Sequence, residues 1–177
     1  MTDSSRDAIL LAARKAFARL PYASVTLRGI AADAGVSASL IVKHFGGKES
    51  LFTTVADFTE AATALLDAPD AELGRHMVCV LVRSRRASNS DPLLRVVFAI
   101  GPGDERAFMR ERFRTQVVQA IAARLCGQDK AVRAELVAAH LLGLGAALAV
   151  DRTGPLAKAP VEKVADLYAP GVQALIH

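Results

Sequence analysis

The chain has 177 residues, of which 52% are hydrophobic and 5% aromatic, and its formal charge is +4. This length suffices for one small domain joined to a second, larger one, and the abundance of Ala, Leu, Val and Arg favours helices over strands. The only cysteines, Cys79 and Cys126, lie far apart and lack zinc-ligand spacing. They exclude a disulfide framework, and we expect free thiols, no metal and no cofactor.

The first residues run directly into an amphipathic pattern and lack the basic, apolar and small-residue order of a signal peptide. The longest apolar run, residues 136–150, contains His140 and two glycines and is shorter than the ~20 residues of a membrane span. We therefore expect a soluble cytoplasmic protein with no membrane association.

Residues 25–52 fit two short helices joined by a tight turn. Thr26 can cap a helix over about residues 27–34, Gly35 tolerates the left-handed turn conformation, and Ser37 can cap a second helix over about residues 38–44. This pattern is a helix-turn-helix, which lays its second helix in the major groove of DNA. A helical hairpin without a DNA role would show similar spacing, so this alternative stays open.

In the second of these helices, Ile41 and Phe45 can pack inward. This leaves five side chains largely exposed, those of Ala38, Ser39, Leu40, Val42 and Lys43. Small residues at its start allow close approach to a groove, and Lys43, His44 and Lys48 can reach phosphates. The candidate DNA-binding residues are Thr26, Arg28, Ser37, Ala38, Ser39, Leu40, Val42, Lys43, His44 and Lys48.

Residues 6–58 resemble the N-terminal domain of the TetR family of bacterial transcription regulators. The resemblance includes an amphipathic first helix with Ile9, Ala13 and Phe17, the helix-turn-helix, and the His-Phe-x-x-Lys-Glu-x-Leu segment at residues 44–51. The family usually has two tyrosines just before that segment, where this chain has Val42 and Lys43, and often has a glycine where this chain has Ser39. These departures leave the operator sequence open.

The resemblance implies an all-α protein with two domains. Residues 1–50 would form the helix-turn-helix DNA-binding domain, and residues 51–177 a helical effector-binding and dimerisation domain. A homodimer would bind a palindromic double-stranded DNA operator and act as a repressor rather than an activator. A small-molecule effector would release the dimer from the operator.

Beyond Phe58 the chain reads as helices separated by breakers, over about residues 49–66, 70–87, 92–100 and 104–126. The basic excess lies here, because residues 75–114 carry nine arginines against four acids. Arg83 and Arg95 could recognise an acidic effector. We expect the others, such as Arg85, Arg86, Arg110, Arg112 and Arg114, to form a solvated face.

Residues 137–150 are apolar or small on nearly every side, which predicts burial all round. In a domain of this size, the partner of the outer face is the same helix of a second subunit, although a monomer core helix is the alternative. A second helix over residues 161–175 could complete a four-helix interface, with Pro170 kinking or breaking it. The candidate dimer residues are Leu142, Gly143, Ala146, Ala147, Val150, Val164, Leu167, Tyr168, Val172 and Leu175.

An effector pocket is expected between the linking helix and the dimer helices, as in regulators of this kind. Its candidates are mainly apolar with a few polar groups, as ligand pockets usually are, and plain core packing is the alternative for each apolar residue and for His140. They are Met77, Cys79, Arg83, Phe98, Phe108, Met109, Phe113 and His140.

Catalytic motifs do not assemble in the sequence. It contains no Gly-x-Ser-x-Gly, no phosphate loop and no His-Glu-x-x-His, and its acids are scattered. We therefore expect no enzyme activity. The alternatives are a helical small-molecule-binding protein or enzyme without a DNA role, and a regulator controlled by a protein partner.

Overall fold

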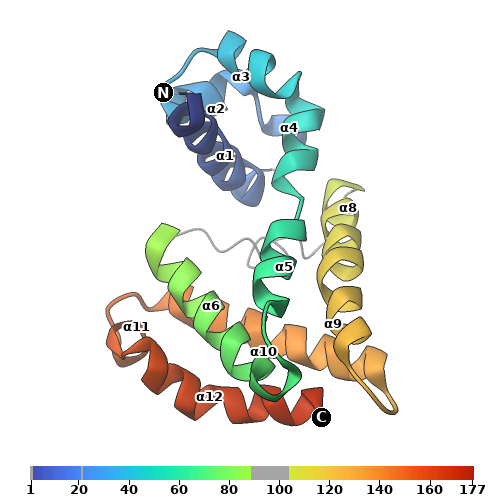
Figure 1. Ribbon diagram of the computed structural model, residues 1–177. Coiled ribbons are helices and arrows are strands. Elements are labelled where there is room, and N and C mark those ends of the chain that lie inside the picture. The colour runs from blue at the N-terminus through green and yellow to red at the C-terminus, as the bar shows by residue number, and fades with distance from the viewer. Residues whose placement is uncertain (1, 21, 89–103) are drawn as a thin grey trace. The chain divides into compact units, whose positions relative to one another are not determined.

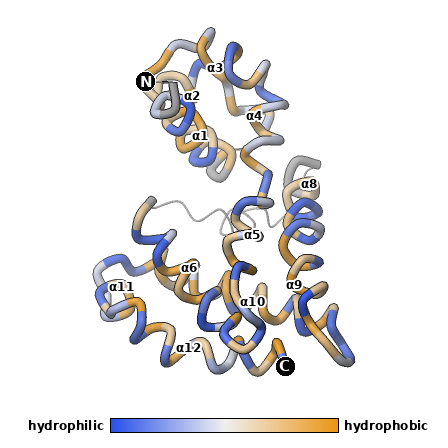
Figure 2. The backbone as a smooth tube through the Cα atoms, viewed as in Figure 1, coloured by the Kyte–Doolittle hydropathy of each residue, from blue (hydrophilic) through white to orange (hydrophobic). Residues whose placement is uncertain are grey.

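The computed structural model describes residues 2–20, 22–88 and 104–177, and every regular element within these ranges is a helix (Figure 1). The all-α prediction is therefore confirmed. The described residues form two compact units, residues 2–57 with 104–109 and residues 58–88 with 110–177. Figure 2 shows hydrophobic and hydrophilic residues interspersed along the helices of both units, as is typical of amphipathic helices.

The first unit is built around a core that every one of its long helices enters. Ile9, Ala13, Ile30, Ile41 and Leu51 are each at most 1% exposed. The i,i+4 spacing of the first two confirms the inward face predicted for the first helix. The helices of this unit are α1 (Thr2–Arg19), the 3₁₀ turn η1 (Tyr22–Ser24), α2 (Leu27–Ala34), α3 (Ala38–Phe45) and α4 (Lys48–Val55).

The second unit is organised by three long helices, α6 (Leu73–Ser88), α10 (Lys130–Val150) and α12 (Val161–Ile176). Helix α12 packs along α6, and α10 packs against both. Helix α8 (Asp104–Phe113) contributes residues to both units and continues without interruption into the second. The other elements of the second unit are α5 (Thr59–Leu66), the 3₁₀ turn η2 (Asp70–Glu72), the π-helical segment η3 (Arg114–Val118), α9 (Gln119–Arg124) and α11 (Pro155–Lys158).

A glycine allows α6 and α12 to approach closely. A Cβ atom at Gly74 would lie 2.8 Å from the backbone nitrogen of Gln173, a separation that real side chains do not show. The Gly74 amide instead donates to Oε1 of Gln173 at 2.7 Å, and Nε2 of Gln173 donates to the Asp70 carbonyl at 2.7 Å. One glutamine side chain thus satisfies backbone groups at the start of α6, where helix amides lack partners within the helix.

The continuous helix predicted over residues 49–66 is wrong, because the chain breaks between α4 and α5. Phe58 occupies the break with no exposed surface, and its amide donates to Oε1 of Gln116 at 2.8 Å. Its ring meets Phe113 edge-on, with centroids 5.6 Å apart. The break buries a large aromatic side chain while a side-chain acceptor replaces the lost helical hydrogen bond.

The helix predicted over residues 104–126 is interrupted by the π-helical segment η3 and ends at Arg124. The Arg124 guanidinium donates to the carbonyls of Leu66 and Ala68 and pairs with Asp70 at 2.6 Å. It thus supplies hydrogen bonds to backbone carbonyls at the end of α5, which lack partners within the helix.

Two other helix predictions also differ. Helix α6 is preceded by a 3₁₀ turn rather than beginning at Asp70. Helix α12 continues through Pro170, so of the predicted kink or break the break does not occur. The short helix predicted over residues 92–100 lies outside the described residues.

Candidate functional site

Helices α2 and α3 are set by caps that the sequence predicted. Thr26 Oγ1 accepts the Gly29 amide at 3.1 Å, and Ser37 Oγ accepts the Leu40 amide at 3.2 Å. Gly35 adopts φ of +66° between the helices, a conformation that costs glycine little, and the Val36 amide then bonds to the Ala31 carbonyl. The two hydroxyls are thus used for capping, and the predicted helix-turn-helix is present.

Helix α3 presents a mixed polar and apolar face to solvent. Ile41 and Phe45 are buried, as predicted, while Ser39, Val42 and Lys43 are exposed. Leu40 is half-buried, which corrects the prediction that it is largely exposed. The prediction that Ala38 is largely exposed is wrong, because this side chain is half-buried and packs against the core of the unit. The small methyl group of Ala38 therefore anchors the start of the helix.

Lys48 lies at the start of α4, and its ammonium is held by an aromatic ring. Its Nζ atom is 4.2 Å from the ring centroid of Tyr22, within the range of a cation–π contact. Tyr22 in turn stacks on Phe17 at 5.8 Å and meets Phe52 edge-on at 5.2 Å. Sequence reasoning missed Tyr22, since no local pattern links it to a residue so far along the chain.

The start of α4 also borders a surface hollow. Gly46, Gly47, Lys48, Glu49 and Ser50 contribute to its lining, together with Thr53. No side chain caps the helix at Gly47, so backbone amides at this terminus remain available. A helix N-terminus beside a lysine favours a phosphate group.

The remaining predicted DNA-binding residues are placed less specifically. Arg28 is exposed on α2, and His44 is half-buried with its ring 6.2 Å from that of Phe45. Arg6 lies over the Phe45 ring, with its guanidinium carbon 5.5 Å from the ring centroid. Arg6 was not among the predicted residues, because only the fold brings α1 to the end of α3.

The predicted effector residues are divided between the two units. Phe108 and Met109 belong to the first unit, and the other described candidates to the second. Met77, Met109 and Phe113 are buried, Cys79 and His140 are half-buried, and Arg83 and Phe108 are exposed. Phe98 and the neighbouring candidate Arg95 lie outside the described residues.

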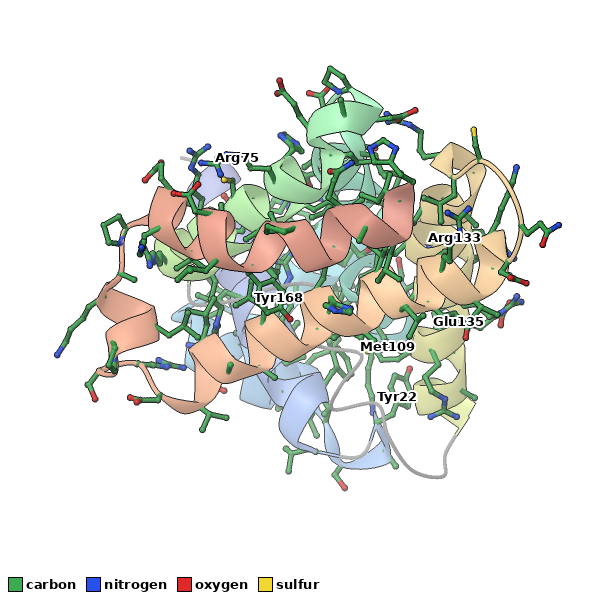
Figure 3. The ribbon with its side chains drawn as sticks, turned by 90° about the horizontal axis from the view of Figure 1, so that it is seen from below. Tyr22, Arg75, Met109, Arg133, Glu135 and Tyr168 are labelled. Atoms are coloured by element: carbon green, nitrogen blue, oxygen red, sulfur yellow. The ribbon has the colours of Figure 1, made fainter. Side chains whose placement is uncertain are left out.

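The contacts described for these candidates run to residues outside the predicted effector set. Phe108 lies 5.9 Å from the Phe52 ring, and Arg83 pairs with Glu162 at 3.4 Å. The His140 ring bonds through Nδ1 to the Leu136 carbonyl at 2.9 Å. The hydroxyl of Tyr168 donates to the His140 carbonyl at 2.8 Å, which ties α12 to α10 (Figure 3). Burial raises the pKa of this hydroxyl.

The expectation that Arg85 belongs to a solvated face is wrong. Its side chain is 8% exposed and is the one charged side chain classed as buried in the described part of the chain. Arg86, Arg110 and Arg114 are exposed, as predicted, and Arg112 is half-buried. Arg114 pairs with Glu111 at 2.6 Å, a contact that lowers the pKa of that carboxyl.

An exposed apolar stripe follows α10 at helical spacing. Its members recur every three or four residues and are all exposed: Val132, Leu136, Ala139, Gly143, Ala147 and Val150. On α12, Leu167 is 73% exposed, and Gly171 and Ala174 are also exposed. Val164 and Val172 do not lie on this open surface, because they are buried in the core of their own unit. Leu142, Ala146, Tyr168 and Leu175 are half-buried.

Two further observations bear on other kinds of site. Within the described ranges, no group of three or more His, Cys, Asp or Glu side chains lies close enough together to hold a metal ion, and Cys79 and Cys126 are free thiols.

Helix α10 is long and apolar enough to cross a membrane by length and composition alone. Length and composition alone are weak evidence of a membrane span, and α10 packs against α6 and α12 within its unit.

Comparison with known proteins matches both parts of the chain. A family model described as "Bacterial regulatory proteins, tetR family" matches residues 9–55, and one described as "Tetracyclin repressor-like, C-terminal domain" matches residues 71–176. No curated protein sequence matches the chain.

Solved structures extend the likeness over nearly the whole chain. A TetR-family regulator from Streptomyces coelicolor is 30% identical, with a TM-score of 0.61, and the match covers 98% of this chain and 95% of that one. The fatty acid degradation regulator FadR from Bacillus halodurans is 15% identical, with a TM-score of 0.67 and coverage of 95% and 97%. NalD, the secondary repressor of a multidrug efflux pump in Pseudomonas aeruginosa, is 20% identical, with a TM-score of 0.60 and coverage of 98% and 96%. The last two show the fold alone.

Proposed function

Because the chain belongs to the TetR family of bacterial transcription regulators, we propose that it is a repressor that binds a palindromic DNA operator as a homodimer. In this proposal residues 1–50 form the DNA-binding domain and residues 51–177 the effector-binding and dimerisation domain. The protein works in the cytoplasm and catalyses no reaction. A small-molecule effector releases it from the operator.

The exposed face of α3 is the observation that supports sequence-specific DNA binding. Ile41 and Phe45 hold the helix in its unit, and Ser39, Val42 and Lys43 remain open to a partner. In this arrangement Ser39 and Val42 contact base edges in the major groove, where a serine can bond to several bases and an apolar group suits a thymine methyl. Lys43 contributes a phosphate contact in place of the tyrosine that is usual in the family.

Phosphate contacts at the start of α4 position the recognition helix in this proposal. Lys48 supplies charge, and the uncapped amides beside Gly47 donate to a second oxygen of the same DNA backbone. These contacts carry no sequence information, so they set affinity and register rather than the choice of operator.

The apolar stripe on α10 supports the dimer. A contiguous exposed apolar face on a helix this long marks an interaction surface, and Gly143 and Ala147 allow two helices to approach closely. With Leu167 and Gly171 of α12 alongside, two subunits form a four-helix interface. Such a dimer presents two recognition helices to half-sites about 34 Å apart, or a multiple of that distance.

Effector release follows from a shift between two conformations of the dimer. A ligand that binds the conformation unable to contact DNA must weaken operator binding by the same factor by which DNA weakens ligand binding. Helix α8 is suited to carry this coupling, because it contributes residues to both units and continues into the π-helical segment η3. Such segments occur often at functional positions.

The test is selection of bound fragments from a random DNA pool by the purified, folded protein. We expect an enriched inverted repeat. Absence of enrichment by a protein whose folding is verified by circular dichroism would contradict the DNA-binding role. Enrichment of a single half-site by a monomer would contradict the dimer but would still support sequence-specific DNA binding.

A further inference from the structure

A cavity in the second unit is lined by arginines that the proposed function does not use. Its volume is about 220 Å³, and its lining comes from the end of α6, the end of α10, the loop after it, and α11. This volume lies below the ~300–1,000 Å³ of sites for drug-sized ligands, so the cavity suits a small group. The lining residues are Arg85, Arg86, Leu148, Arg152 and Ala157.

Three positive charges at one cavity repel one another. None of the described lining residues is acidic, and Arg85 is 8% exposed, so water screens its charge poorly. Arg85 also has another interaction within the chain, but the five N–H donors of a guanidinium allow it to serve two partners. An anion in the cavity would offset this repulsion and accept hydrogen bonds from Arg86 and Arg152.

Two described acids close in the chain to lining residues, Asp151 and Glu162, have other partners. Asp151 Oδ1 accepts the amides of Thr153 and Gly154 at 3.0 and 2.8 Å, which lower the pKa of this carboxyl and hold it in the turn after α10. Glu162 pairs with Arg83, a residue that does not line the cavity.

Two of the lining guanidinium groups retain free donors. Arg86 donates through Nη2 to the carbonyl of Ala159, and this bond places its guanidinium against the start of α12 while using one donor. Arg152 is exposed and makes no ion pair with any residue in the described ranges.

We propose that this cavity binds a small oxyanion, the phosphate or carboxylate group of a small molecule, through Arg85, Arg86 and Arg152. Guanidinium groups match both oxyanions with paired, charge-assisted hydrogen bonds. None of the predicted effector residues that the structure describes lines the cavity. Its existence does not depend on DNA binding, so it can be tested whether or not the chain is a repressor.

The experiment is calorimetric titration of the full chain with inorganic phosphate and, separately, with acetate, each against sodium chloride of equal ionic strength. We expect saturable binding of at least one of these probes, and the preferred probe identifies the source of the oxyanion. Arg152→Gln should weaken this binding at least tenfold, about the effect of losing one hydrogen bond to a charged group. Arg86→Gln should weaken it similarly.

The matched control is Arg75→Gln, which removes the same charge from α6 at an exposed position that does not line the cavity. Unchanged anion affinity in this variant, with loss in Arg152→Gln, supports the site. Equal weakening in all three variants, or heat that follows ionic strength alone, would show general charge attraction and overturn the proposal. Binding of a DNA duplex that requires Arg152, with no binding of phosphate or acetate, would overturn it in favour of a nucleic-acid surface.

Discussion

The ammonium of Lys48 lies 4.2 Å from the centre of the Tyr22 ring, although the two residues belong to different helical elements. The ring is itself fixed by Phe17 and Phe52, so the lysine at the start of α4 has a restricted position before any DNA is bound. A side chain ordered in advance loses less conformational entropy when it contacts a phosphate.

Replacing Tyr22 should therefore weaken DNA binding without removing any charge. We expect Tyr22→Leu to reduce duplex affinity about two- to fivefold, which corresponds to the ~0.5–1 kcal/mol of an exposed cation–π contact. Fluorescence anisotropy with a labelled duplex measures the change, and Tyr22→Phe, which keeps the ring, should bind like the wild type. In the Lys48→Ala background, the Tyr22→Leu substitution should have no further effect.

Lys48 and the exposed face of α3 should differ in what they control. Lys48→Ala should weaken binding to all duplexes alike and reduce the dependence of affinity on salt concentration by about one phosphate contact. Substitutions at Ser39 or Leu40 should instead change which operator is enriched from a random pool, with the salt dependence preserved. An unchanged salt dependence in Lys48→Ala would refute its phosphate contact.

The break between α4 and α5 depends on the side chain of Gln116. Gln116→Met keeps a similar volume but leaves the Phe58 amide without the acceptor now 2.8 Å away. We expect a loss of about 1–2 kcal/mol in the free energy of unfolding, the usual effect of an unsatisfied buried amide. Urea denaturation measures it, with Gln119→Met at an exposed position of the same helical run as the control. Equal stability of the two variants would show that water replaces the glutamine.

The apolar stripe on α10 should hold the dimer. Ala147→Glu places a charge at the point where two copies of the helix meet, so the variant should sediment as a folded monomer and lose affinity for the full inverted repeat. Ala131→Glu introduces the same residue at an exposed position of α10 outside the stripe and should remain dimeric. A dimer that survives Ala147→Glu would locate the interface elsewhere.

The turn after α10 should show a pH-dependent stability. The amides of Thr153 and Gly154 lower the pKa of Asp151 in the folded chain, so the carboxylate stabilises the fold above its unfolded pKa of about 3.9. This contribution is lost as pH falls through the lower folded pKa. The melting temperature of Asp151→Ala should thus be below that of the wild type at pH 7 and approach it near pH 3. Asp151→Asn, which keeps the acceptor without the titration, provides the control.

The sequence by itself determined the features that depend on neighbouring residues. Thr26, Gly35 and Ser37 act within one turn of their own backbone, because a cap or a left-handed glycine needs no distant partner. The inward positions of Ile41 and Phe45 follow from helical spacing in the same way.

Only the tertiary structure decided which distant side chains meet. Tyr22 orders Lys48, Gln116 completes the break at Phe58, and Arg85 and Arg86 join Arg152 at one cavity. Val164 and Val172 have the same apolar character as the exposed Leu167, yet packing buries them in their own unit. These outcomes depend on how helices dock, and docking depends on the combined shape of many side chains, which the order of residues along one helix does not reveal.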